Sequence, residues 1–418
     1  MPTTHHRRLT DMTGLTHLSA TTVTSDPQAA YRALQERWGM VAPVELEPGI
    51  PAWLVMGHHE LCQVMRNEQV FSCDSNNWRL LREGVVSPDA GIGPMMFPRQ
   101  SAYFADGDQH RRLRAPIEEA LATLDEHRLA RLVRQTCHEQ IRGFADRGAA
   151  DLVAEYAAVV STTTMSSLFG VEDDQKPELR ASLVAMYSAA SESVAPAMAV
   201  ERIVTDTLNA RRVAPGDDLM SLFVRHPNLR SDVEIVQAAL LMMAAGYEAN
   251  ANWIAQTLRL MLSDPRFEGR LRGGRLGLDD ALDEALWRDP PMPNMPARYA
   301  LVDCELGGQL VQRGDALILG IAAANQDSRV HTNDSWLEDG NRSHLAWSAG
   351  PHGCPAHRPG RMITRTAVDI ALHQLHDLTL AIPADELPLL PSPWSRCPPS
   401  LPVRFTPPGP APRHSLSG

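Results

Sequence analysis

Hydrophobic and polar positions alternate with helical spacing through most of the middle of the chain. Apolar residues recur every three to four positions between helix-start and helix-stop residues such as Asp, Ser, Pro and Gly. This pattern is found in five segments, 108–147, 151–170, 177–213, 231–263 and 278–288. Shorter runs predict strands at Pro51–Met56, Leu301–Leu306 and Ala316–Ile321, with a helix from His58 to about Asn67. We therefore predict a mainly α fold with a minor β-sheet (α+β), in which both ends of the chain contribute strands.

The segment from Ser231 to Asp264 predicts one unusually long helix. It opens with the capping pair Ser231 and Glu234 and ends before a proline. At about 1.5 Å per residue, such a helix is roughly 50 Å long. Its stretch Val236–Ala245 is apolar on every side, which is typical of a helix that runs through a protein interior.

Polar groups follow directly in this helix, at Gly246, Glu248, Asn250 and Asn252. Burying a carboxylate and two amides costs free energy unless they meet a ligand, water or another polar group. The sequence alone leaves a second interpretation open, in which the helix emerges into solvent at Glu248.

Composition places the chain among globular proteins. It has 418 residues, of which 44% are hydrophobic and 21% charged. The 39 Lys and Arg against 50 Asp and Glu give a net charge of −11, which disfavours general affinity for nucleic acid or anionic membranes. Neither a membrane span nor a signal peptide is recognisable, so we expect a cytoplasmic protein. We predict a mobile segment over 1–26, a single domain over 27–406 and a Pro-rich disordered tail over 407–418.

The cysteine pattern excludes common structural cross-links. Six cysteines are scattered without a CxxC pair, which disfavours a disulfide framework or a four-cysteine zinc site. Cys354 stands apart because it lies in a glycine-bearing loop just before a helical stretch. A helix start favours a thiolate, so we expect a lowered thiol pKa and a capacity to bind a metal. Two alternatives are a buried, unreactive cysteine and a zinc site made of His352, Cys354 and His357, although that close spacing does not match common zinc patterns.

Around Cys354 the sequence resembles the cytochrome P-450 family of haem-thiolate monooxygenases, whose signature is an aromatic residue, glycines, a His or Arg, and then the iron-ligating Cys. The resemblance covers about residues 27–406, with several further motifs in the family's order. These are Trp53–Met56, Asp106–Arg114, Ala245–Glu248, Arg298, Ala323–Asp327 and Leu401–Phe405. It implies a cytochrome P-450 fold with the long helix lying over the haem.

The resemblance also implies a cofactor and roles for individual residues. Cys354 would ligate the iron of haem b, where a thiolate favours O–O cleavage. Gly246 would leave room for dioxygen and Glu248 would help to deliver protons. The haem propionates would be neutralised by four residues, His110, Arg114, Arg298 and His352, and arginine suits this role because its planar fork pairs with carboxylates.

The sequence departs from the family pattern in the long helix. The residue after the acid is usually a Thr whose hydroxyl steers protons to bound oxygen, and here it is Ala249. Asn250 points about 100° further round the helix and cannot simply replace that hydroxyl. Our hypothesis is that a substrate hydroxyl, or a water held by Glu248 and Asn250, fills this gap.

A second departure lies in the family's Glu-x-x-Arg motif. Glu284 is present, but Trp287 occupies the arginine position. Because residues four apart share a helix face, we predict that Arg288 pairs with Glu284 and that Trp287 packs as a core aromatic. The stretch 330–342 is short where the family usually supplies a further arginine, and Arg342 is the candidate for that place.

By this resemblance the protein is a monooxygenase that inserts one atom of O2 into a small-to-medium apolar organic substrate, with a secondary metabolite among the candidates. Electrons would come from NAD(P)H through a ferredoxin reductase and a ferredoxin, which could dock on a basic stripe formed by Arg358, Arg361 and Arg365. The alternative is a catalytically altered haem protein that acts as a sensor, a partner or a peroxide-dependent peroxygenase. Apolar substrate contacts are expected in the loops 71–103 and 182–202, at Met95, Met96, Phe97, Met186 and Met198.

Overall fold

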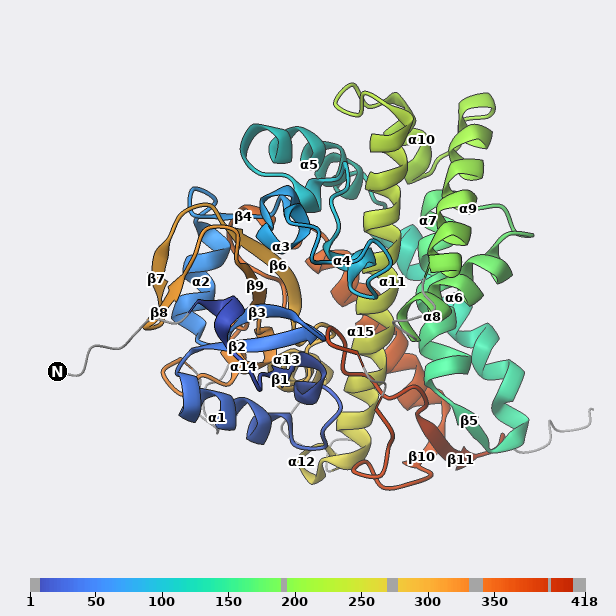
Figure 1. Cartoon of the computed structure of the whole chain (residues 1–418). Coiled ribbons are helices and arrows are strands. Elements are labelled where there is room, and N and C mark those ends of the chain that lie inside the picture. The colour runs from blue at the N-terminus through green and yellow to red at the C-terminus, as the bar shows by residue number, and fades with distance from the viewer. Residues whose placement is uncertain (1–7, 189–193, 269–276, 331–340, 390–391, 409–418) are drawn as a thin grey trace, which may run out of the picture.

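Helices fill one side of the molecule and the largest sheet lies on the other (Figure 1). The computed structural model describes residues 8–188, 194–268, 277–330, 341–389 and 392–408. The α-helices in these ranges are α1 (Pro27–Trp38), α2 (His58–Arg66), α3 (Arg79–Arg82), α4 (Gly93–Met96), α5 (Gly107–Ala122), α6 (Glu126–Phe144), α7 (Ala158–Phe169), α8 (Lys176–Ser188), α9 (Val194–Val213), α10 (Leu219–Arg225), α11 (Asp232–Ser263), α12 (Pro265–Glu268), α13 (Leu278–Arg288), α14 (Ile321–Asn325) and α15 (His357–Gln374). The predicted mainly α architecture is confirmed.

The largest sheet has the strand order β1-β2-β3-β9-β6-β4, so strands from distant parts of the sequence are neighbours. At its centre β3 pairs in parallel with β9, with Trp53 opposite Leu317. This confirms that both ends of the chain build the sheet. Two smaller sheets have the orders β10-β11-β5 and β7-β8. The strands are β1 (Thr16–His17), β2 (Val41–Glu47), β3 (Ile50–Val55), β4 (Phe71–Ser72), β5 (Ala149–Asp151), β6 (Met295–Ala300), β7 (Cys304–Leu306), β8 (Gln309–Val311), β9 (Ala316–Leu319), β10 (His376–Leu380) and β11 (Pro402–Thr406).

The long helix α11 runs through the middle of the helical side, beside α7, α9, α13 and α15 (Figure 1). Its cap is the predicted one, since the Ser231 hydroxyl accepts the N–H of Glu234. The bounds of α13 also agree with the sequence pattern. The segment 108–147 instead forms two helices, because the Asp125 side chain accepts the N–H groups of His127 and Arg128 and caps a new helix there.

The N-terminal segment differs from the prediction of a mobile region over 1–26. Residues 8–26 carry β1, which pairs with β2, and two short 3₁₀ helices. Leu18 is fully buried against the sheet, which gives this segment apolar contacts that its polar composition did not reveal. Residues 1–7, and residues 409–418 of the predicted tail, lie outside the described ranges. Within the part that the structure describes, no helix is long and apolar enough to cross a membrane.

Candidate functional site

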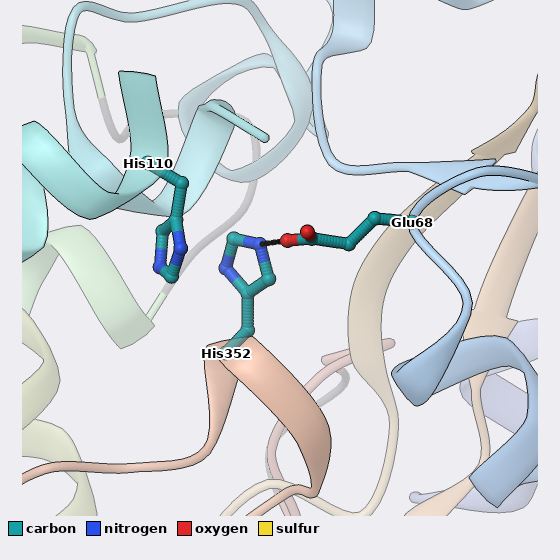
Figure 2. Close-up of side chains that lie close together, drawn as sticks. All are labelled: Glu68, His110 and His352. Atoms are coloured by element: carbon teal, nitrogen blue, oxygen red, sulfur yellow. Dashed lines mark ion pairs between the residues drawn. The ribbon is translucent and has the colours of Figure 1, made fainter. Parts of the chain in front are cut away.

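Residues from three distant elements meet beside the loop that precedes α15. His110 and Arg114 lie one turn apart on α5, Arg298 lies on β6, and His352 ends the 3₁₀ helix η9 (Gly350–His352). The rings of His110 and His352 lie side by side, with centroids 4.0 Å apart (Figure 2). The structure therefore brings the four predicted haem-propionate partners to one region.

Two of these side chains carry polar atoms that are buried without a partner. The Arg298 side chain is almost fully buried, and its Nη1 donates only to the carbonyl of the neighbouring Ala297, at 3.1 Å. Arg298 Nη2 and His110 Nε2 make no hydrogen bond within the described ranges. A buried guanidinium without a carboxylate partner is costly, so this arrangement fits a site for an anionic group.

The electrostatics of the cluster also favour an anion. Burial, together with the nearby Arg298, His110 and Arg114, lowers the pKa of His352 to about 2. Burial and the charge of Arg114 likewise hold the pKa of His110 below its usual value. Both imidazoles are therefore neutral at pH 7 and sit among fixed positive charges, where an anionic ligand would be stabilised.

Acidic and thiol groups that the sequence did not single out border this cluster. His352 Nε2 lies 3.3 Å from Glu68 Oε1 (Figure 2) and 3.1 Å from Cys73 Sγ. Two groups, Glu68 with the two histidines and Cys73 with Asp106 and His352, have a spacing that could hold a metal ion. The positive charges of Arg298 and Arg114 would repel a metal cation at this place. Tertiary packing brings Cys73 to His352, a contact that the spacing of the cysteines in the sequence does not indicate.

The loop around Cys354 is held by backbone contacts. The N–H of Cys354 donates to the carbonyl of Trp347 at 2.8 Å, and Arg114 Nη2 donates to the carbonyl of Gly353 at 2.5 Å. Gly350 has a φ of +70°, and a Cβ there would lie 2.5 Å from the carbonyl oxygen of Met65, so this position requires glycine. The loop thus packs directly against α5 and α2.

The thiol of Cys354 differs from the prediction. Its pKa is raised, because burial outweighs the backbone N–H of Ala356, which stabilises the thiolate. The helix α15 begins only at His357, so its dipole contributes less than expected. The zinc alternative is wrong as well, because the exposed His357 does not join His352 and Cys354 in a metal-binding group among the described residues.

One face of α11 remains uncovered in the middle of the helix. Ala245 is exposed and Met242 and Ala249 are half-buried, whereas the intervening Tyr247 and Glu248 are buried. Residues 242, 245 and 249 share a helix face by their spacing. This apolar stripe is where α11 can contact a bound molecule.

Gly246 has a packing role that the sequence did not indicate. A Cβ at this position would lie 2.5 Å from Sδ of Met165 on α7, so glycine allows the two helices to approach. The family resemblance implied instead that this glycine leaves room for dioxygen. In the structure, the three atoms nearest to a Cβ built at Gly246 all belong to Met165.

Glu248 is buried, so the interpretation that α11 emerges into solvent there is wrong. Burial raises the pKa of Glu248 to about 7, although Asn252 and Ser395 hydrogen-bond the carboxyl and lower it. The Asn252 Nδ2 to Glu248 Oε1 distance is 2.8 Å. Asn250 points elsewhere, since its Nδ2 donates to the carbonyl of Gly246 at 2.8 Å and its Oδ1 lies next to Gly360 of α15. The hypothesis that Glu248 and Asn250 hold one water together is therefore not supported.

The altered Glu-x-x-Arg motif has the predicted geometry. Arg288 Nε lies 2.5 Å from Glu284 Oε1 within α13. Trp287 is 3% exposed, and its indole Nε1 donates to the carbonyl of Asn341 at 3.2 Å. Arg342, the candidate for the family's further arginine, pairs with Asp283, with Nε 3.3 Å from Oδ2. Residues 331–340 of the short stretch before it lie outside the described ranges.

The predicted basic stripe is neutralised by acidic side chains. Arg358 pairs with Glu126, Arg361 pairs with Asp279 and Asp283, and Arg365 pairs with Asp279. These three arginines therefore do not form a surface of unbalanced positive charge. Among the proposed substrate contacts, Met96 is fully buried, Met95, Phe97 and Met186 are partly buried against the cores, and Met198 is 67% exposed.

No protein-family model matches the chain, but individual proteins do. The chain is 26% identical over 377 residues to 2-hydroxy-5-methyl-1-naphthoate 7-hydroxylase of Streptomyces carzinostaticus, covering 87% of this chain and 91% of the relative. It is 29% identical to nocardicin C N-oxygenase of Nocardia uniformis subsp. tsuyamanensis, covering 87% and 92%. It is 25% identical to the cytochrome P450 monooxygenase PikC of Streptomyces venezuelae, covering 91% of each chain.

Solved structures give the same result for the fold. The structure of CYP154A1 from Streptomyces coelicolor A3(2) superposes with a TM-score of 0.82 and 27% identity, covering 92% of this chain and 98% of that one. CYP154C4 from Streptomyces sp. W2061 superposes with a TM-score of 0.83 and 25% identity, covering 92% and 96%.

Proposed function

The chain belongs to the cytochrome P450 family of oxygen-incorporating oxidoreductases, which carry haem b, and we propose that Cys354 ligates the haem iron while Arg298, His110, Arg114 and His352 hold the propionates. The observation that carries this proposal is the pair of buried, unpartnered polar atoms on Arg298 and His110. They come from separate elements and meet beside the Cys354 loop. A dianionic group at this place would satisfy both atoms and compensate the buried charge of Arg298.

Thiolate-ligated haem supplies the activation of O2. The residues of this chain hold the group, exclude water and supply a proton. Burial raises the pKa of the Cys354 thiol, and the backbone N–H of Ala356 acts in the opposite direction by stabilising the thiolate that would ligate the iron. Glu248 is a buried acid in the middle of α11 with a pKa of about 7, which suits it to hold and release a proton near neutral pH.

We propose a small-to-medium apolar organic molecule as substrate. The apolar stripe of Met242, Ala245 and Ala249 on α11 supports this, because it offers an uncharged surface without hydrogen-bonding side chains. The electrons would come from NAD(P)H through a ferredoxin reductase and a ferredoxin. Since Arg358, Arg361 and Arg365 are paired, their stripe alone does not provide the docking charge.

The second candidate function is a peroxide-dependent peroxygenase or a haem sensor. One specific observation favours it, namely that Ala249 carries no hydroxyl to assist proton transfer. Peroxide already contains reduced oxygen, so a peroxygenase needs no electron supply. Product formation with hydrogen peroxide alone, compared with NAD(P)H and surrogate redox partners, distinguishes the two functions, and a haem protein inactive under both conditions is left as a sensor.

The decisive experiment is the carbon monoxide difference spectrum of the reduced, haem-loaded protein. We expect the red-shifted Soret band of thiolate-ligated haem, and its loss in Cys354→Ala. Cys304→Ser is the matched control, because this half-buried thiol lies on β7, away from the site. A normal band in Cys354→Ala, or a folded wild-type protein that takes up no haem, would contradict the proposal.

A further inference from the structure

The carboxyl of Glu248 meets a hydroxyl from the loop before β11. Asn252 Nδ2 donates to Glu248 Oε1 at 2.8 Å and lies 2.9 Å from Ser395 Oγ. Asn252 Nδ2 thus bridges the carboxyl and the hydroxyl, and the Ser395 hydroxyl lowers the pKa of Glu248 by stabilising its charged form. Glu248 and Asn252 are buried, whereas Ser395 is half-buried and has access to solvent. Ser395 is thus a hydroxyl that connects the buried acid with the outside.

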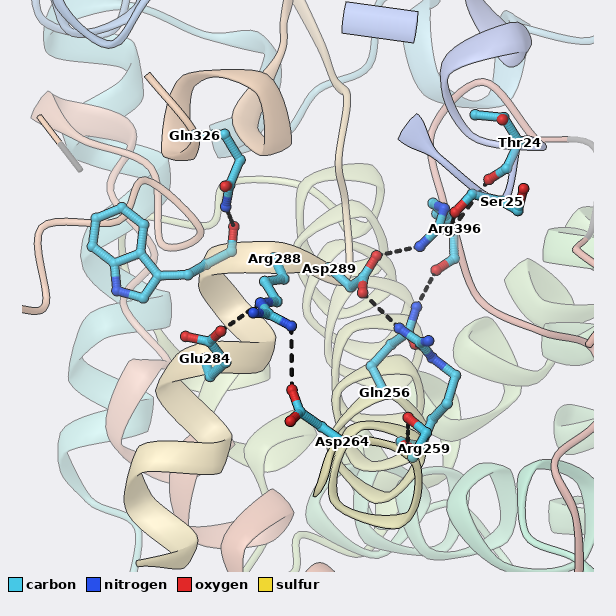
Figure 3. A network of polar contacts seen from close by, with 12 residues as sticks. Thr24, Ser25, Gln256, Arg259, Asp264, Glu284, Arg288, Asp289, Gln326 and Arg396 are labelled. Atoms are coloured by element: carbon cyan, nitrogen blue, oxygen red, sulfur yellow. Dashed lines mark hydrogen bonds and ion pairs between the residues drawn. The ribbon is translucent and has the colours of Figure 1, made fainter. Parts of the chain in front are cut away.

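The position of Ser395 is fixed by a polar network around the next residue, Arg396 (Figure 3). The Arg396 guanidinium forms an ion pair with Asp289, and Arg259 holds the other oxygen of this carboxylate at 2.6 Å. Gln256 of α11 donates to the carbonyl of Arg396. Because Asp289 follows α13 and Gln256 and Arg259 lie on α11, the loop is attached to the same helix that carries Glu248.

The N-terminal segment strengthens this attachment. Arg396 Nη2 donates to the carbonyls of Thr24 and Ser25, at 3.2 and 3.5 Å (Figure 3). Within the loop itself, the Ser392 hydroxyl accepts the N–H groups of Trp394 and Ser395, both at 3.2 Å. The loop is therefore bonded on both sides of Ser395, which a surface loop without a positioning role would not require.

We infer that Ser395 positions Glu248 and relays protons to it. Ser395, in the loop before β11, thereby supplies the hydroxyl that α11 lacks at Ala249. This inference rests on the proposed function. After Glu248 has released a proton into the site, its carboxylate would take the hydroxyl proton of Ser395 in the same step in which the Ser395 oxygen takes a proton from a hydronium ion of the solvent. One O–H bond of Ser395 breaks as another forms, so no alkoxide is left and the relay returns to its starting state.

The groups around Glu248 do not titrate near pH 7, so the titration of its carboxyl can be followed separately. Tyr247 on the same helix and Cys397 on the loop both feel the charge of Glu248, and burial raises both pKa values, so both remain protonated at neutral pH. The nearby charges of Arg396 and Asp289 are paired with each other. Asn252 and Ser395 themselves are neutral. The carboxyl is thus the group of this cluster that titrates near pH 7.

The relay is tested by infrared spectroscopy of the haem-loaded protein as a function of pH. We expect a carboxylic-acid C=O band that titrates near pH 7 and is absent in Glu248→Gln. Ser395→Ala should shift the midpoint to higher pH, because it removes a hydrogen bond that stabilises the charged form. Ser395→Thr, which keeps the hydroxyl, should restore the midpoint. Ser400→Ala is the control, since it changes a half-buried serine of the same loop that has no hydrogen bond to this cluster among the described residues.

A second measurement follows proton delivery directly. With surrogate redox partners, Ser395→Ala should divert a several-fold larger share of electrons to peroxide, and Ser395→Thr should not. An unchanged carboxyl midpoint in Ser395→Ala, or equal peroxide release by Ser395→Ala and Ser400→Ala, would overturn the relay. Neither result depends on the carbon monoxide spectrum, so failure of the relay remains distinct from failure of the haem-thiolate assignment.

Discussion

The rings of His110 and His352 lie with their centroids 4.0 Å apart, at an interplanar angle of 32°. Neither ring gains charge at neutral pH, because burial and the arginines lower both pKa values. The two neutral rings and the guanidiniums of Arg298 and Arg114 offer directional N–H donors, and the carboxylates of Glu68 and Glu118 lie at the border of this site. Such a site binds a planar dianion better than it binds a metal ion.

The first prediction concerns Arg298, whose buried guanidinium has no carboxylate partner in the part of the chain that the structure describes. Arg298→Leu should weaken haem binding by roughly tenfold or more, because charge-assisted hydrogen bonds contribute about 1.5–3 kcal/mol each. The same change should leave the haem-free protein equally or more stable to urea, because an uncompensated charge leaves the interior.

Haem titration and urea unfolding of both forms measure these two effects. Arg404→Leu, on the exposed side of β11, should change neither. A haem-free Arg298→Leu protein that is clearly less stable than wild type would show that Arg298 has a structural role independent of haem.

The second prediction concerns the ion pair in α13. Arg288→Ala should destabilise the protein by about 2 kcal/mol, because it leaves the buried carboxylate of Glu284 with weaker compensation. Arg266, at 3.7 Å from Glu284, limits the loss. Arg365→Ala, which breaks an exposed pair with Asp279, should cost about 0–1 kcal/mol in the same urea unfolding experiment. Equal costs for the two variants would contradict the structural importance of the shifted pair.

The third prediction concerns acid sensitivity. Burial lowers the pKa of His344 to about 4, from an unfolded value of about 6.5. As the pH falls, His344 is protonated in the unfolded chain before it is protonated in the folded protein. The contribution of the neutral, buried His344 to stability is therefore complete above pH 6.5 and is lost as the pH falls towards 4. The loss amounts to about 3 kcal/mol. His344→Phe keeps a ring against Trp287 and should flatten this part of the stability profile.

Urea unfolding at pH 7 and pH 5 should show about 2 kcal/mol of this loss, because the interval reaches about 1.5 pH units below the unfolded pKa. His373→Phe is the control, because this side chain is largely exposed and its charge costs little. If the His344→Phe and wild-type proteins lose the same stability between the two pH values, another group is responsible for the acid sensitivity.

The fourth prediction concerns Ala249. In the Ser395→Ala background, Ala249→Thr should recover part of the product formation, because it provides a hydroxyl one residue from Glu248. Loss of a proton-transfer group typically lowers a rate by about a hundredfold or more, so partial recovery is measurable. In the wild-type background, Ala249→Thr should have little effect. The partition of electrons between product and peroxide is the measurement, and a strong gain in the wild-type background would mean that Ser395 does not serve as the relay.

Some of these features were predictable from local sequence and others were not. The pairing of Arg288 with Glu284 follows from i,i+4 spacing within one helix, and the cap at Ser231 follows from residues three apart. Both depend on neighbours in the chain. The meeting of His110, Arg298 and His352 was expected only through the resemblance to a known family.

Errors arose where the three-dimensional neighbours decide the outcome. The raised pKa of Cys354 comes from burial, which the loop sequence does not encode. Gly246 contacts Met165 of another helix, and Ser395 reaches Glu248 from the far end of the chain. No periodicity in either segment predicts such contacts.

The parallel pairing of β3 with β9 has a consequence for synthesis of the protein. Trp53 leaves the ribosome long before its partner Leu317 exists, so one edge of β3 stays unpaired during translation. At about 5–20 residues per second, this interval lasts roughly 10–50 s. An unpaired hydrophobic strand favours aggregation over that time. Expression with added chaperones should therefore raise the yield of folded protein, because they cover the strand edge until β9 emerges.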